Sequence, residues 1–199
     1  MSIRDKIISF KRLHATISVI LFTSLILFCI FSLPNLSLST ISLSRFGITE
    51  GTNYVWNTGL FIVGLMLYVS AFRNVYSYHK DSIINKRLTL LFAISTMMLL
   101  ITAVVDMTHS AHTITAISYF VGYTFSIFLF GYRLLESDFR MGMTSIVLSL
   151  CSMFIPILTL FVFPGLAIPE IIHTIFIFLW DITLTFDVEY KNLLKKINL

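Results

Sequence analysis

The sequence predicts an all-α membrane protein, a bundle of six transmembrane helices with both termini in the cytoplasm. Of its 199 residues, 57% are hydrophobic and only 12% are charged, whereas soluble domains carry about twice that charged fraction. Six apolar stretches approach or exceed the length of about 20 residues that a helix needs to cross a bilayer. The basic residues gather in alternate connections between these stretches. This composition excludes a water-soluble enzyme, a disordered chain and a nucleic-acid-binding domain.

The six stretches follow one another without an intervening soluble domain, so residues 1–199 are predicted to form a single transmembrane domain. The stretches are too long for barrel strands and do not alternate apolar with polar side chains. A backbone in lipid must satisfy its hydrogen bonds within its own segment, which requires helices. The predicted helices cover about residues 16–33, 53–72, 88–105, 112–135, 143–163 and 168–186.

Polar or helix-breaking residues separate the predicted helices. The first ends before Pro34, and because no small-residue cleavage box follows it, we expect a retained helix and not a cleaved signal peptide. The second ends before Arg73 and the third before Asp106. Arg133 closes the fourth, and Pro164 separates the fifth from the sixth.

The distribution of Lys and Arg predicts the orientation, because short loops rich in these residues face the cytoplasm. Arg45 is the single basic residue in the connections assigned to the outer side. The other basic residues fall in the termini and in the inner loops: Arg4, Lys6, Lys11, Arg12, Arg73, Lys80, Lys86, Arg87, Arg133, Arg140, Lys191, Lys195 and Lys196. Both termini are therefore expected in the cytoplasm, with membrane lipids as the surrounding partners.

The outer side is left with an unusual set of titratable side chains: Glu50, Asp106, His109, His112, Glu170 and His173. Three histidines and an acid could supply the ligands of a zinc ion, which takes three or four nitrogen, sulfur or oxygen donors. The same histidines also fit solvated or helix-capping roles. We therefore predict no cofactor and keep zinc at His109, His112 and His173 as an alternative.

One stripe of the last predicted helix carries several of the ionisable residues. Glu170 and His173 lie about 60° apart around the helix axis, and Asp181 lies about 20° from Glu170 and about 16 Å deeper. An ionisable group at mid-membrane costs about 2.5–3.5 kcal/mol and usually faces the bundle interior. Asp181 is expected either to be neutral and bonded to a Ser or Thr of another helix, or to face a polar cavity.

The outer loop 36–47 alternates apolar with hydroxyl side chains. It is expected either to dip its apolar residues into the membrane interface or to cover the end of the bundle. Arg45 is expected to form a salt bridge with Glu50, Asp106 or Glu170, with a lipid phosphate as the alternative. Asn57, near the start of the second helix, needs a hydrogen-bond partner, by default on another helix.

Four segments together resemble a known family: 42–47 (SLSRFG), 56–64 (WNTGLFIVG), 112–120 (HTITAISYF) and 165–170 (GLAIPE) followed by Trp180. They are similar to the prokaryotic six-helix membrane proteins grouped as domain of unknown function 998. The arrangement is also distantly similar to the Frag1/DRAM/Sfk1 group. The resemblance covers nearly the whole chain and implies the plasma membrane of a prokaryote.

The family has no established activity, so the resemblance implies only a polar signature, at Ser44, Asn57, His112 and Glu170. His109, His173 and Asp181 match no pattern of the family, which weakens a three-histidine zinc site.

Three functions remain open at this point. The first is binding of a lipid headgroup or small polar ligand in an outward-facing pocket. The second is a lipid hydrolase or transferase in which His112 acts as base and Glu170 as acid, or both hold a metal. The third is a proton-coupled transporter with Asp181 as carrier. The candidate pocket residues are Asn57, His112, Glu170, Asp106, His109, His173, Asp181, Ser44 and Arg45.

Overall fold

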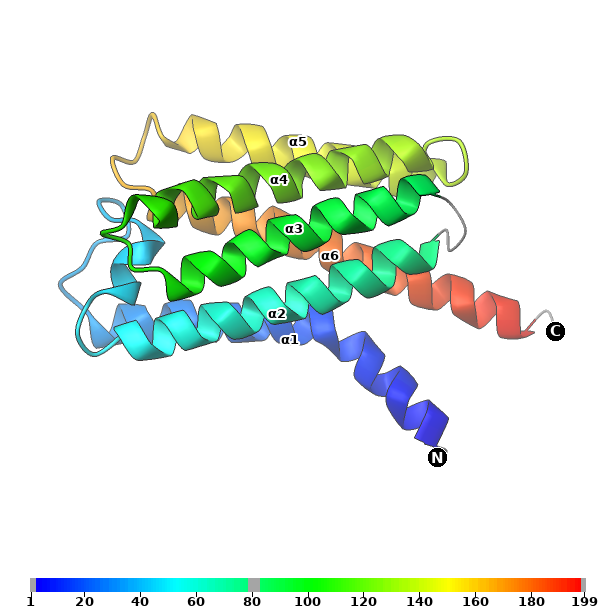
Figure 1. The fold of residues 1–199 in the computed structure, drawn as a ribbon, viewed down its shortest axis with the longest axis horizontal. Coiled ribbons are helices and arrows are strands. Elements are labelled where there is room, and N and C mark those ends of the chain that lie inside the picture. The colour runs from blue at the N-terminus through cyan, green and yellow to red at the C-terminus, as the bar shows by residue number, and fades with distance from the viewer. Residues whose placement is uncertain (1–2, 79–82, 198–199) are drawn as a thin grey trace.

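A computed structural model describes residues 3–78 and 83–197, and the side chains of 14–76 and 86–191. Its six long helices form one bundle (Figure 1). They are α1 (Ile3–Ser32), α2 (Asn53–Tyr78), α3 (Ile83–Val104), α4 (Ser110–Leu134), α5 (Phe139–Thr159) and α6 (Ala167–Ile197). A short 3-10 helix, η1 (Leu43–Gly47), lies in the connection between α1 and α2. All six helices are long and apolar enough to cross a membrane, and no strand occurs among the described residues. The predicted fold class is confirmed.

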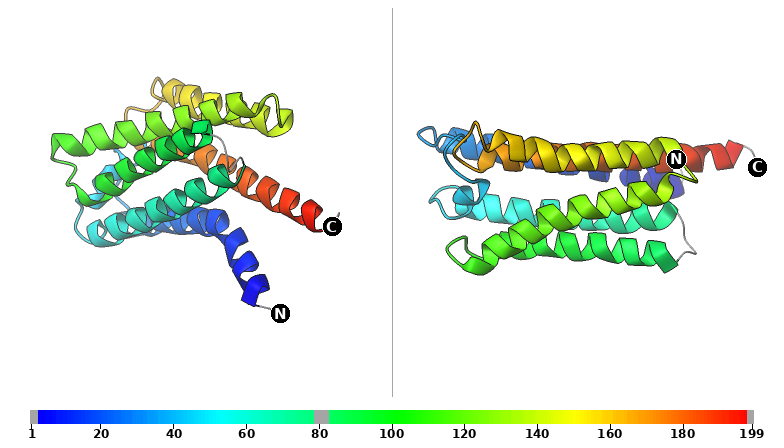
Figure 2. Two further views of the ribbon diagram at one scale, coloured as in Figure 1. Left: turned by 45° about the vertical axis from the view of Figure 1, so that its right-hand side comes forward. Right: turned by 90° about the horizontal axis from the view of Figure 1, so that it is seen from above.

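The helices lie in two layers. Seen from above, α2, α3 and α4 form one layer, and α1, α6 and α5 form the other (Figure 2). Each helix packs against the next in sequence, and α6 also contacts α1 and α2. Because α6 also meets α4 through side chains, it lies against helices of both layers.

The connections alternate between two ends of the bundle. The α1–α2, α3–α4 and α5–α6 connections share one end, which we call the η1 end (Figure 1). Both termini and the α4–α5 connection lie at the opposite end, as the predicted topology requires. That this opposite end faces the cytoplasm stays a prediction.

Two of the basic side chains assigned to the cytoplasmic side, Arg73 and Lys191, have acidic partners. Arg73 pairs with Glu189 at 3.0 Å, and Lys191 pairs with Asp187 at 2.8 Å and with Asp138. For other basic residues used for the orientation, the side chains lie outside the part of the chain that the structure describes: Arg4, Lys6, Lys11, Arg12, Lys80, Lys195 and Lys196.

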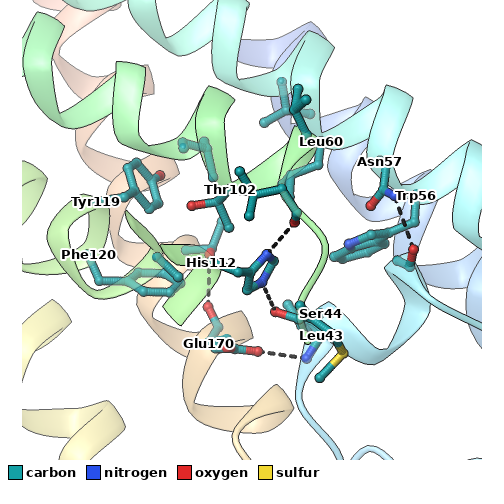
Figure 3. A pocket seen from close by; sticks show the side chains of 18 of the residues that line it. Leu43, Ser44, Trp56, Asn57, Leu60, Thr102, His112, Tyr119, Phe120 and Glu170 are labelled. Carbon is teal, nitrogen blue, oxygen red and sulfur yellow. Dashed lines mark hydrogen bonds between the residues drawn. The ribbon is translucent and has the colours of Figure 1, made fainter. Parts of the chain in front are cut away.

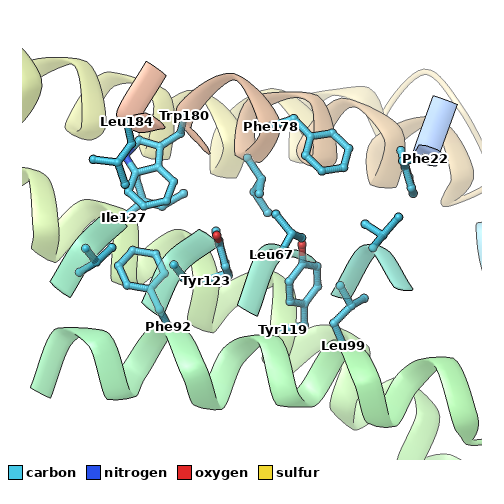
Figure 4. Close-up of a cluster of buried hydrophobic side chains, with 14 of the residues drawn as sticks. Phe22, Leu67, Phe92, Leu99, Tyr119, Tyr123, Ile127, Phe178, Trp180 and Leu184 are labelled. Atoms are coloured by element: carbon cyan, nitrogen blue, oxygen red, sulfur yellow. The ribbon is translucent and has the colours of Figure 1, made fainter. Parts of the chain in front are cut away.

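The core lies between the two layers and is built on aromatic side chains (Figure 4). The Trp180 ring stacks on Phe92 with centroids 5.1 Å apart, and Tyr123 and Phe130 meet its face edge-on. The indole N–H of Trp180 donates to Ser145 Oγ at 2.9 Å, so its one polar atom is satisfied. This stack joins α3, α4 and α6.

Side-chain caps set the starts of two helices. His109 Nδ1 accepts a hydrogen bond from the Ala111 N–H before α4, and Asp138 accepts one from the Met141 N–H before α5. The fifth helix therefore runs Phe139–Thr159, four residues earlier than the predicted 143–163. Pro156 lies in the last turn of this helix.

The loop 36–47 covers the end of the bundle. Leu43 and Phe46 of η1 are buried, and Leu36, Leu38 and Ile41 pack against the core. The backbone of the loop also pairs with the α5–α6 connection and the first residue of α6, because Gly165 N–H donates to Ser39 O and Ala167 N–H donates to Ile41 O, both at 2.8 Å. The structure therefore shows the second of the two expected arrangements, in which the loop covers the end of the bundle.

Candidate functional site

A cavity of about 150 Å³ lies beneath η1, lined by residues of α1, α2, α3, α4 and α6 (Figure 3). We call it the η1 cavity. Most of its lining is apolar, as is usual for ligand sites in proteins. Five of the candidate residues line it: Ser44, Asn57, Asp106, His112 and Glu170.

His112 lies in the first turn of α4 and is 8% exposed. Its Nδ1 is 2.8 Å from Val105 O, and its Nε2 is 2.8 Å from Ser44 Oγ. A carbonyl oxygen only accepts, so Nδ1 carries the hydrogen and donates to it. In the neutral imidazole Nε2 is then an acceptor, and Ser44 donates to it.

Glu170 lies in the first turn of α6. Its Oε2 accepts a hydrogen bond from the Leu43 N–H at 2.7 Å. An acidic side chain is also favoured in this position by the positive end of the helix dipole. Glu170 thus ties the start of α6 to the first residue of η1.

Asn57 lies one turn into α2, and its side-chain N–H donates to Gly47 O at 3.1 Å. A Cβ on Gly47 would lie only 2.5 Å from Asn57 Oδ1, so a side chain there would push the amide away. The partner of Asn57 is therefore η1, and not another transmembrane helix as expected.

The three polar residues predicted to form the pocket all bond to η1. Asn57 from α2, His112 from α4 and Glu170 from α6 each bond to a different residue of η1, and all three line the η1 cavity. They converge around η1, and not through direct hydrogen bonds to one another.

Asp106 lines the η1 cavity from the α3–α4 connection but is exposed to solvent. The backbone N–H and the hydroxyl of Thr108 both donate to its Oδ1 at 2.8 Å. These two hydrogen bonds hold the pKa of Asp106 below its usual range, because they favour the ionised carboxylate.

Arg45 is exposed, and among the described side chains it pairs with no acid. The predicted salt bridge to Glu50, Asp106 or Glu170 is wrong for this structure. Glu170 and Asp106 instead accept hydrogen bonds from the backbone N–H groups of Leu43 and Thr108. Glu50 is exposed to solvent, where an ion pair gains little.

His173 is 8% exposed and lies apart from His112, where α4, α5 and α6 meet. Its Nδ1 donates to Ser152 O at 2.7 Å, and its Nε2 lies 3.2 Å from Thr124 Oγ1. Phe120 packs edge-on against the imidazole with centroids 4.7 Å apart.

The zinc alternative requires ligands that converge. His109 instead caps α4, His112 bonds to Ser44, and His173 bonds to Thr124. Across the described residues, no group of three or more His, Cys, Asp or Glu side chains is placed to hold a metal ion.

Asp181 is 1% exposed and lies deeper in the bundle, outside the lining of the η1 cavity. Ser70 Oγ, on α2, donates to its Oδ1. The side-chain amide of Asn74 donates to both Ser70 Oγ at 3.0 Å and Thr185 Oγ1 at 2.9 Å. Of the two expectations for Asp181, the structure shows the hydrogen bond to a serine of another helix.

Three buried oxygens of this region have no partner among the described residues: Asp181 Oδ2, Asn74 Oδ1 and Tyr123 OH. Sequence reasoning missed Ser70 and Asn74 as neighbours of Asp181. Ser70 and Asn74 are four residues apart, which places them on one face of a helix, and this spacing in the sequence could have indicated them. The predicted second helix ended at residue 72, so Asn74 was left outside the membrane span.

A second, larger hollow of about 740 Å³ lies on the lipid-facing side between α4 and α5, with α6 as its floor. We call it the α4–α5 groove. Its lining is almost entirely apolar and comes from the middle of α4 and from the half of α5 nearer the η1 end. Toward the other end of the bundle the two helices are in close contact, because a Cβ on Gly131 would lie 2.8 Å from Gly142 O. Phe120 and Glu170 line both the groove and the η1 cavity.

This fold and site define a six-helix transmembrane protein in which polar residues of three helices meet beneath a capping 3-10 helix. The family model described as "Protein of unknown function (DUF998)" matches residues 16–187, and the chain belongs to this family. The predicted family is confirmed, while the distant similarity to Frag1/DRAM/Sfk1 stays a prediction. No curated protein and no solved structure matches the chain.

Proposed function

We propose that the protein binds a membrane lipid whose small polar headgroup enters the η1 cavity in the outer half of the plasma membrane. One observation carries this proposal. Polar residues that lie far apart in the sequence, from η1, α2, α4 and α6, line a single cavity at one end of the bundle.

The size of the η1 cavity limits the group that it can take. Its volume of about 150 Å³ is similar to that of a protein cavity that accommodates benzene. Sites for drug-sized ligands are larger, about 300–1,000 Å³. A glycerol-sized group therefore fits, and a sugar headgroup does not.

The charges of the lining favour a neutral or cationic headgroup. Asp106 and Glu170 contribute carboxyl groups, and no Lys or Arg lies among the residues that line the cavity. A phosphate would approach these acids without a basic partner, and unpaired charges of like sign are unfavourable in a partly dehydrated site. Hydroxyl groups or an amine would instead find acceptors there.

The α4–α5 groove provides a place for an acyl chain of the same lipid. The groove lies within the membrane-spanning parts of α4 and α5, where acyl chains are the surrounding solvent. Phe120 and Glu170 border both spaces, so a headgroup in the cavity and a chain in the groove would meet at these two residues.

Thermal unfolding of the purified protein in detergent tests the proposal. A monoacylglycerol should raise the unfolding temperature, since a ligand at a hundredfold excess over its Kd stabilises by about 2.7 kcal/mol. Phosphatidylglycerol should raise it less, because its phosphate lacks a basic partner. The stabilisation by monoacylglycerol should also be lost in His112→Ala.

A cavity-filling variant sharpens this experiment. Ala116 lines the η1 cavity, so Ala116→Leu should remove the lipid-dependent shift. Ser118 lies two residues further on α4 and is exposed, so Ser118→Leu adds the same bulk on the outer face and should keep the shift. Equal shifts in the wild type and in Ala116→Leu would exclude the cavity as the binding site.

A further inference from the structure

The contacts of His112 form a continuous hydrogen-bonded chain of three groups. Ser44 Oγ donates to Nε2 at 2.8 Å, and Nδ1–H donates to Val105 O at 2.8 Å. The carbonyl of Val105 fixes both the orientation of the ring and the tautomer whose Nε2 accepts from Ser44. A hydroxyl, a base and a group that orients the base are the parts of an activated nucleophile.

A nucleophile also needs access to a substrate, and the position of Ser44 beside the η1 cavity provides it. Ser44 and His112 both line the η1 cavity, and His112 is otherwise shielded from solvent. Ser44 is held in place from both sides, because its neighbour Leu43 is bonded to Glu170 and Gly47 is bonded to Asn57.

The position of Ser44 also indicates which bond would lie beside it. In a glycerolipid, the ester groups join the headgroup to the acyl chains. With its headgroup in the η1 cavity and an acyl chain in the α4–α5 groove, the lipid would have an ester near Phe120 and Glu170, which border both spaces. Glu170 contacts the residue next to Ser44.

We propose that Ser44 is a catalytic nucleophile, with His112 as its general base, and that the pair cleaves the ester of a neutral glycerolipid. This inference rests on the proposed function, since the same cavity and groove must hold the lipid.

The reaction proceeds in two steps. Ser44 Oγ attacks the ester carbonyl carbon while His112 Nε2 takes the Oγ proton. The bond between the carbonyl carbon and the glycerol oxygen then breaks, the glycerol oxygen takes the proton from Nε2, and the acyl group remains on Ser44. Water attacks this acyl-serine, gives one proton to Nε2 and releases the fatty acid, and Nε2 returns the proton to Ser44 Oγ.

A fluorophosphonate probe with an alkyl chain tests the proposal, because such probes form stable adducts with activated serines. The purified full-length protein should be labelled, and mass spectrometry of the wild-type adduct should place it on Ser44. This mapping needs no variant, so it holds even where a substitution impairs folding.

Variants then test the role of each group. Ser44→Ala should abolish labelling, whereas Ser42→Ala should keep it, because Ser42 is two residues away and makes no side-chain cap hydrogen bond. His112→Asn keeps an amide that can donate to Val105 O but removes the base. Its labelling rate should fall at least about 100-fold, the lower end of what general base catalysis contributes.

The outcomes separate this inference from the proposed function. Labelling at Ser44 that depends on His112 and is slowed by monoacylglycerol supports it. A lipid-dependent rise in the unfolding temperature without any labelling, or with the adduct on another serine, overturns the nucleophile and leaves the binding site standing. Absence of both the thermal shift and the labelling overturns the two together.

Discussion

The polar side chains of Asn57, His112 and Glu170 each form a partly buried hydrogen bond with one group of η1. Gly47 O, Ser44 Oγ and the Leu43 N–H are these three groups. A buried donor or acceptor left unpaired costs about 1–3 kcal/mol. At the scale of residues, the same contacts that line the cavity therefore also hold η1 in place.

Substitutions of Glu170 separate its hydrogen bond from its charge. Glu170→Ala should lower the free energy of unfolding by about 1–3 kcal/mol, because the Leu43 N–H loses its acceptor. Glu170→Gln keeps an acceptor oxygen and should cost clearly less. Thermal unfolding of both variants measures the difference, and equal losses would mean that the Leu43 contact contributes little.

Some of these residue roles could be predicted from the sequence, and others could not. The polar character of Asn57, His112 and Glu170 at the ends of apolar stretches marked them as candidates, because such residues are costly in lipid. Their partners are two backbone groups and one serine in a loop. Backbone partners leave no trace in the side-chain pattern, which is why the role of η1 was missed.

The three-histidine zinc alternative rested on the spacing of the histidines along the chain. Spacing does not show whether His173 and His112 lie close together in the fold.

At the scale of elements, η1 and the loop before it form a cap that is held by both the helices and the α5–α6 connection. The tightest point is Gly165, where a Cβ would lie 2.5 Å from the backbone N and O of Ile41. They are backbone atoms, and Ile41 O accepts a hydrogen bond from the Ala167 N–H at 2.8 Å, so this segment has little freedom to move.

Gly165→Ala should therefore destabilise the protein by about 1–3 kcal/mol, the cost of forcing an added methyl group into a packed contact. Gly122→Ala is the matched control. The nearest atom to its added Cβ is Ser95 Oγ, the end of a side chain that can rotate. A smaller loss in Gly165→Ala than in Gly122→Ala would contradict the close approach of the two loops.

The ends of the helices were the least predictable part of the elements. Residues 160–163 are apolar and were assigned to the fifth helix, yet the helix ends at Thr159. Hydropathy does not distinguish a helical residue from an apolar loop residue at a membrane boundary. The caps Asp138 and His109 set the actual starts, and Asp138 is of a type that favours this position.

At the scale of the whole molecule, the six helices follow from composition alone, because a lipid-embedded backbone has few alternatives to the helix. The two-layer arrangement does not follow from composition, since large apolar side chains occur both in the core and on the exposed faces of the helices. Small residues set one of the contacts between helices, as at Gly131 and Gly142.

The orientation in the membrane gives a prediction at this scale. In a Cys151→Ser background, Glu50→Cys at the η1 end should react with a membrane-impermeant maleimide in intact cells. Glu136→Cys, in the exposed α4–α5 connection, should react only after the membrane is permeabilised. Cys29 is buried and should stay unlabelled under both conditions. The reverse pattern would place the termini outside.

The two tryptophans offer the most direct test of the central claim, that a lipid headgroup enters the η1 cavity. Trp56 lines this cavity, whereas Trp180 is fully buried in the aromatic stack of the core. In proteoliposomes, the fluorescence of Trp180→Phe, which reports on Trp56 alone, should change saturably as monoacylglycerol is added. The change should be absent in Trp56→Phe and in Trp180→Phe combined with Ala116→Leu. Fluorescence of Trp56 that stays constant, or that changes equally when Ala116→Leu fills the cavity, would contradict the account.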